Sequence, residues 1–140
     1  MRCQIDTIMD IQFKNPFGFQ LEILETDDHV PSFRINVHIA IEQFQHKYQY
    51  EGNFWIECSV WDSFVHALQH PSAETTSLHD MSEHFALSIQ NTAQGLVLRW
   101  EFSKKDVGGK RQMAAHFISS IDEEVLAKIR QSFEGFPVWW

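Results

Sequence analysis

The chain has 140 residues, of which 44% are hydrophobic and 14% aromatic, and its formal net charge at pH 7 is −8. These values predict one folded domain over residues 1–140 and exclude an intrinsically disordered chain. The negative balance argues against nucleic-acid binding, and no apolar run approaches the roughly 18 residues of a membrane-spanning helix.

Alternating apolar residues predict three strands in the first third of the chain. They cover residues 5–13, 19–24 and 33–41, and Asn15-Pro16 with Gly18 marks a turn between the first two. The third strand is the clearest, because its apolar residues are odd-numbered from Phe33 to Ile41 and its other face is polar. One solvated face is typical of an antiparallel sheet.

Residues 54–60 alternate as a strand and lead into a helix without a loop. The helix is predicted over residues 60–69, with Ser59 as N-cap and Pro71 ending it. Its apolar stripe has helical spacing and consists of Trp61, Phe64, Val65 and Leu68. This stripe predicts packing against a sheet and not a chemistry.

The second half of the chain predicts three more strands and a second helix. The strands begin at Leu78 and continue to Ile89, then cover 96–102 and 111–119; Ser120 and Glu123 suggest a capping box before a helix of about four turns. The order predicts an α+β fold: a twisted antiparallel sheet of about six to eight strands with two helices packed on one face.

Histidine clusters are the first candidates for a metal or catalytic site. His66 and His70 have i, i+4 spacing but lie off the apolar stripe, while the densest titratable cluster is His79, Asp80, Glu83 and His84. Neither has an accompanying motif for a metal site. No Gly-x-Ser-x-Gly elbow or phosphate-binding loop is present. We therefore predict no enzyme activity, no cofactor and no bound metal.

The two cysteines and the basic cluster also receive structural interpretations. Cys3 and Cys58 lie in apolar strand-like runs and are expected to be reduced and buried. The cationic residues gathered around Gly108-Gly109 are expected to form a solvated hairpin tip. Because the first residues do not resemble a signal peptide, we expect a cytoplasmic protein.

Five residues are predicted to contact a partner: Trp55, Trp139, Trp140, His38 and Glu101. Aromatic residues dominate the energetics of many protein interfaces. For the C-terminal Phe-Pro-Val-Trp-Trp segment the favoured alternative is that it folds back and covers one end of the sheet, since exposed apolar area is costly.

Three features share an order along the chain. They are the stripe Trp61, Phe64 and Leu68 in a short helix after a strand, the alternating strands 85–89 and 96–100, and the final helix with Ile121-Asp122, Leu126 and Ile129. In pattern and order they resemble the WapI-type immunity proteins and related small bacterial families of unknown function. The resemblance implies a non-catalytic protein that neutralises a cognate toxin domain by occluding it.

Two hypotheses about function follow. The first is an intracellular binding protein, immunity-like, whose acidic surface suits a basic toxin domain. The second is a small-molecule-binding domain or enzyme with a closed cavity between sheet and helices, into which His38, His84 or His116 points. The chain is expected to be a monomer or a homodimer.

Overall fold

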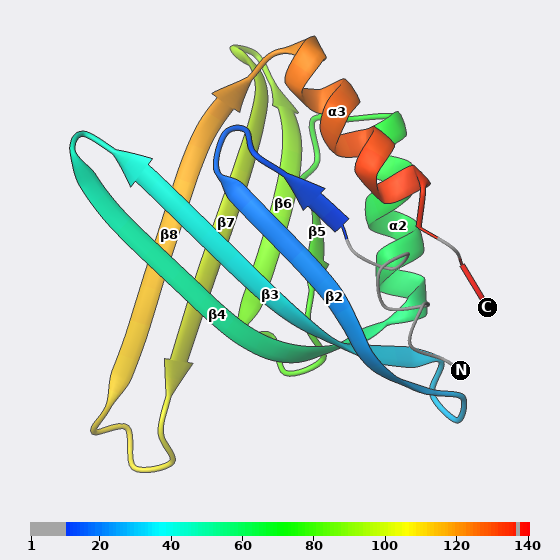
Figure 1. The fold of residues 1–140 in the computed structure, drawn as a ribbon, viewed down its shortest axis with the longest axis vertical. Helices are drawn as coiled ribbons and strands as arrows, with labels where there is room; N and C mark the ends of the chain where they lie inside the picture. The colour runs from blue at the N-terminus through cyan, green and yellow to red at the C-terminus, as the bar shows by residue number, and fades with distance from the viewer. Residues whose placement is uncertain (1–10, 137) are drawn as a thin grey trace.

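The computed structural model describes residues 11–136 and 138–140, which adopt an α+β fold with eight antiparallel strands and two helices (Figure 1). The elements in chain order are β1 (Ile11–Phe13), β2 (Gly18–Asp27), β3 (Ser32–Gln43), β4 (His46–Glu57), α2 (Cys58–Gln69), β5 (Thr76–His79), β6 (Phe85–Thr92), β7 (Gly95–Lys105), β8 (Gln112–Ile121) and α3 (Glu123–Glu134). The predicted fold class is confirmed. Residues 5–10 of the first predicted strand lie outside the described residues.

The strands form two sheets and not the single sheet that we predicted. The first sheet has the order β1-β2-β3-β4 and the second the order β5-β6-β7-β8, so each is a meander of sequence neighbours. Helix α2 lies between β4 and β5 in the chain, and these two strands belong to different sheets. Figure 1 shows the strands of the two layers crossing at a large angle. Each sheet has one apolar face, and the two faces bury each other.

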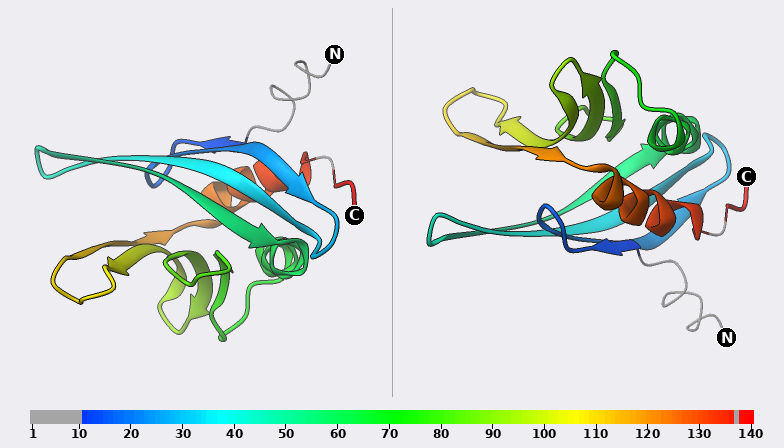
Figure 2. Two further views of the ribbon diagram at one scale, coloured as in Figure 1. Left: turned by 90° about the horizontal axis from the view of Figure 1, so that it is seen from below. Right: turned by 90° about the horizontal axis from the view of Figure 1, so that it is seen from above.

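The helices lie beside the second sheet, next to the edge strands β1 and β5 (Figure 2). Trp61 of α2 also packs against Phe33 on the inner face of the first sheet, with the ring centroids 5.4 Å apart. Ser132 Oγ in α3 donates a hydrogen bond to the carbonyl oxygen of Gln12 in β1 over 3.0 Å. The sheet faces are already occupied by one another, so the helical apolar stripes fill the open side between the layers.

The core includes the helical stripe predicted from the sequence. Trp61, Phe64 and Leu68 are buried and Val65 is half-buried. The helix begins at Cys58, however, and Glu57 occupies the N-cap position without a side-chain hydrogen bond, so the predicted Ser59 cap is wrong. The Cys58 N–H donates instead to the carbonyl oxygen of Pro31 over 2.8 Å, which satisfies the helix end from the neighbouring strand connection.

The second helix is capped two residues later than its predicted capping box, which began at Ser120. Asp122 is the N-cap, and its Oδ1 accepts a hydrogen bond from the Val125 N–H over 2.8 Å. A carboxylate at this position satisfies a free helical N–H and also interacts favourably with the helix dipole. None of the described helices is long and apolar enough to cross a membrane.

Candidate binding surfaces

The outward face of the first sheet is strongly acidic, and we call it the acidic face. It faces the viewer in Figure 1, and no described element covers it. The outward positions of β2 to β4 carry six carboxylates and two cationic residues: Glu22, Glu25, Asp27, Glu42, Glu51 and Glu57, with Arg34 and Lys47. Carboxylates therefore outnumber cations on a surface that remains in water.

Cross-strand register places two of the predicted partner residues on the acidic face. His38 in β3 lies opposite Glu51 in β4, and Trp55 in β4 lies opposite Arg34 in β3. Trp55 is half-buried and borders a shallow hollow that Asp27 and neighbouring residues also line. The acidic face thus combines negative charge with a partly exposed indole.

Two contacts order the polar side chains of the acidic face. The Arg34 Nε donates a charged hydrogen bond to Glu25 Oε1 over 2.6 Å, and the Asn36 Nδ2 donates to Glu51 Oε2 over 3.3 Å. The ion pair offsets much of the one cationic charge near Trp55. Because the pair is exposed, it contributes about 1 kcal/mol or less to stability. Its main effect is electrostatic: Arg34 is neutralised by Glu25, so the other carboxylates keep the potential of the acidic face negative.

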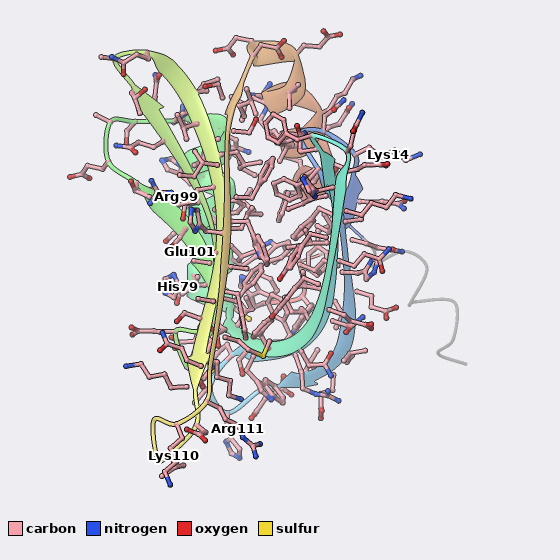
Figure 3. All side chains as sticks on the ribbon, turned by 90° about the vertical axis from the view of Figure 1, so that its left-hand side faces the viewer. Lys14, His79, Arg99, Glu101, Lys110 and Arg111 are labelled. Carbon is pink, nitrogen blue, oxygen red and sulfur yellow. The ribbon has the colours of Figure 1, made fainter. Side chains whose placement is uncertain are left out.

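The outward face of the second sheet is hollowed, and we call this hollow the histidine groove. It has a volume of about 600 Å³ and is open to solvent. Its titratable lining residues are His79, Glu83, His84, Glu101 and His116, and its floor is formed in part by small side chains of β6 and β8. Figure 3 shows His79 and Glu101 projecting from this face, together with Arg99.

A tight turn between β5 and β6 forms one end of the groove. The strand predicted from Leu78 to Ile89 is interrupted here, because Asp80 is buried and its Oδ1 accepts hydrogen bonds from the backbone N–H groups of His84 (2.7 Å) and Phe85 (2.9 Å). Glu83 adopts a left-handed φ of 60° in the same turn. Of the two carboxylates in the predicted cluster, that of Asp80 therefore binds backbone N–H groups, whereas Glu83 is exposed and lines the groove.

The groove does not have the arrangement of a metal centre. Among the residues that the structure describes, no three histidine, cysteine, aspartate or glutamate side chains are close enough to share an ion. His79 Nδ1 instead lies 3.0 Å from Ser77 Oγ, within hydrogen-bond distance. His66 and His70 lie on the exposed side of α2, with ring centroids 4.9 Å apart. In the described part of the chain, the fold brings no additional metal-ligating side chain close to either histidine cluster.

The C-terminal segment packs against the end of the first sheet, as its favoured alternative predicted. Phe33 is fully buried, and the ring centroids of Trp139 and Trp140 lie 5.4 and 5.6 Å from it. The Trp140 indole N–H lies 3.0 and 2.9 Å from the two carboxylate oxygens of Asp62 in α2 and donates to that carboxylate. Trp140 is therefore used for packing, whereas Trp139 is 38% exposed.

The five predicted partner residues consequently fall on three surfaces. Trp55 and His38 share the acidic face, Glu101 lies in the histidine groove, and Trp139 and Trp140 lie at the end of the first sheet. Sequence reasoning missed two carboxylates of the acidic face, Glu51 opposite His38 and Glu22 opposite Asn36. Their alternation with apolar residues was a usable signal, but the register that brings them onto one face with His38 was not visible from the sequence.

Among the residues that the structure describes, burial raises the pKa of two groups, Cys58 and Tyr50. Burial raises the pKa of the Cys58 thiol, and the nearby negative charge of Asp62 adds to the effect. A thiol with a raised pKa is a poor nucleophile. Cys58 is buried, as the sequence predicted. Burial likewise raises the pKa of Tyr50, with smaller effects from Tyr48 and Asp80. Cys3 lies outside the described residues.

No protein-family model matches the chain, and no curated protein matches it significantly.

Proposed function

We propose that the protein is a non-catalytic binding protein whose acidic face recognises a basic protein domain. The observation that carries the proposal is the excess of six carboxylates over two cations on the outward positions of β2 to β4, around Trp55 and His38. Complementary potentials of this kind steer a basic partner towards the surface and disfavour acidic competitors.

The half-buried Trp55 adds apolar contact area to the charged surface. Long-range attraction raises the association rate, while a large aromatic side chain that becomes desolvated in the complex slows dissociation. Trp55 lies within the acidic face, next to the Arg34–Glu25 ion pair, and is suited to that role. In its most specific form the proposal is an immunity protein that covers the active surface of a basic toxin domain, as the resemblance to WapI-type proteins implies.

The test is affinity capture from the source organism with three forms of the protein. The acidic-face variant Glu22→Lys/Glu51→Lys reverses two exposed carboxylates of the first sheet. The control variant Glu74→Lys/Glu134→Lys reverses two exposed carboxylates elsewhere and changes the net charge equally. We expect the wild type and the control to retain a basic protein that the acidic-face variant binds at least about tenfold more weakly.

A second arm tests the immunity form of the proposal. Co-expression with the product of the neighbouring gene should protect cells if that product is the toxin, and the acidic-face variant should lose this protection. The proposal is refuted if no basic protein is captured, or if the control variant weakens binding as much as the acidic-face variant. Capture with no toxicity would reject the immunity role and leave the binding role supported.

The histidine groove favours a second candidate function, the binding of a small ligand. Its volume of about 600 Å³ falls within the range of small-molecule sites, and His84 and His116 line it. The groove is open and lies on the outside of the second sheet, so it differs from the closed cavity between sheet and helices that the sequence predicted, and His38 belongs to the other sheet. A ligand that raises the melting temperature of the wild type but not of a His116→Ala variant would support this function.

A further inference from the structure

The four edge strands of the two sheets are protected very unequally. An uncovered edge presents unpaired backbone N–H and C=O groups and can pair with another strand. Strand β1 is packed against α3, through the hydrogen bond from Ser132 to Gln12, and β5 is packed against α2 (Figure 1). The helices therefore cover one edge of each sheet, and β4 and β8 are the two other edges.

Strand β4 carries the features that oppose pairing. Its outward side chains include the charged residues Lys47, Glu51 and Glu57. Near its end the carbonyl oxygen of Trp55 accepts a hydrogen bond from the Met81 N–H over 2.8 Å, so part of the edge is already occupied. Charged side chains are a common means of preventing unwanted association at a sheet edge.

Strand β8 has no such protection. Its ten residues include no aspartate, glutamate, lysine or arginine. Met113 is 64% exposed and Ile118 is 51% exposed, and among the described residues β7 alone pairs with β8. Figure 3 views the molecule from this side and shows the strand running up the front, uncovered, from the tip at Lys110 and Arg111 towards α3. A long, uncharged and partly apolar edge is the type to which another strand adds.

The residues flanking β8 indicate which strand would add. Lys110 and Arg111 precede it, and Asp122, Glu123 and Glu124 follow it. If a second copy paired in parallel, like charges would lie side by side at both ends. If it paired antiparallel, the cationic end of each copy would meet the acidic end of the other. The charges that flank β8 are thus complementary to those of a second β8 that runs antiparallel to it.

We propose that β8 is a homodimer interface, in which two copies pair antiparallel and join their second sheets into one continuous sheet across a two-fold axis. With Phe117 on the axis, Arg111 comes level with Glu123 of the second copy, and Lys110 with Glu124. In this register odd-numbered residues pair with odd-numbered ones, so the inward and outward faces of the two sheets stay continuous. A closed, isologous dimer is the commonest homo-oligomer.

The dimer has a consequence for the histidine groove. His116 lies on the outward face of β8 and lines the groove, and in the proposed register it lies opposite Ile118 of the second copy. The grooves of the two copies therefore meet at the axis. The acidic faces belong to the other sheet and remain free, so the dimer is independent of the proposed function.

The test is a charge-swap experiment read by analytical ultracentrifugation at about 100 µM, a concentration that populates even a micromolar dimer. The wild type should sediment at twice the monomer mass of 16.4 kDa. The basic-end variant Lys110→Glu/Arg111→Glu and the acidic-end variant Glu123→Lys/Glu124→Lys each place like charges at both ends. Each alone should dimerise at least about tenfold more weakly, read as the dissociation constant from a dilution series that starts at about 100 µM. When the two are mixed, opposite charges meet again and a heterodimer should form.

A matched control and the mixture separate this effect from misfolding. The variant Lys14→Glu/Lys47→Glu changes the net charge as the basic-end variant does, but at exposed sites outside β8, and should remain dimeric. A wild type that is monomeric at this concentration overturns the proposal, and so does a mixture that forms no heterodimer although both variants keep the circular dichroism of the wild type. If either charge variant is unfolded, the proposal is tested by the masses of the wild type and of an Ile118→Lys variant. The wild type should be a dimer and the Ile118→Lys variant a monomer.

Discussion

Trp61 connects three parts of the core, and its replacement by alanine should be among the most destabilising single changes in the chain. The side chain is 1% exposed, and its ring centroid lies 5.4 Å from Phe33 in β3, 5.2 Å from Phe133 in α3 and 4.6 Å from Phe136. Removing a buried tryptophan costs about 3–5 kcal/mol in total, and the three aromatic neighbours place Trp61 in the upper part of that range. We therefore expect Trp61→Ala to lower the free energy of unfolding by about 4–5 kcal/mol.

Urea titration followed by far-ultraviolet circular dichroism measures this loss. With a denaturant dependence of about 2 kcal/mol per molar urea, the midpoint should fall by about 2 M. The matched control is Trp55→Ala, since Trp55 is half-buried on the acidic face, and we expect it to cost about 1 kcal/mol or less. A midpoint shift below about 0.5 M for Trp61→Ala, or equal shifts for both variants, would refute the assignment of Trp61 to the centre of the core.

Two further predictions concern the interior. Asp80→Ala should lower the free energy of unfolding by about 2–3 kcal/mol, because two backbone N–H groups lose the one oxygen that accepts from both. Asp80→Asn should cost less, because its amide oxygen can still accept from both N–H groups, and the same titration checks both variants. Burial raises the pKa of Tyr50 above its ordinary 10.0, so above pH 10.0 the unfolded chain releases a proton that the folded chain keeps. Stability should therefore fall with rising pH by up to about 1.4 kcal/mol per pH unit, and this component should be missing in Tyr50→Phe at equal ionic strength.

The sequence was sufficient for the elements whose patterns are periodic. The alternation from Phe33 to Ile41 and the stripe of Trp61, Phe64 and Leu68 correspond to a strand and a helix in the structure, because each pattern reports burial on one face. The turn at 80–84 was missed for the opposite reason. It depends on one buried carboxylate accepting two backbone N–H groups, and hydrophobic periodicity carries no information about such a contact.

Long-range pairing limited the prediction of the binding surfaces. His38 and Trp55 lie on one face because β3 and β4 are hairpin neighbours, which local sequence order favours. Glu101 lies on a different surface because the chain divides into two sheets, and that division depends on how two apolar faces meet. The contact of Trp140 with Asp62 joins residues 78 positions apart and had no local signal.

The meander order of both sheets bears on how the chain folds. Every strand pairs only with its sequence neighbours among the described residues, so each sheet requires the closure of short loops alone. Short loops cost little chain entropy and form quickly, and rates of folding rise as contacts become more local. The contacts of α3 and Trp140 with the first sheet span most of the chain. We therefore expect two hairpin meanders to form early and the docking of the C-terminal helix to complete folding, so that core substitutions in α3 mainly accelerate unfolding.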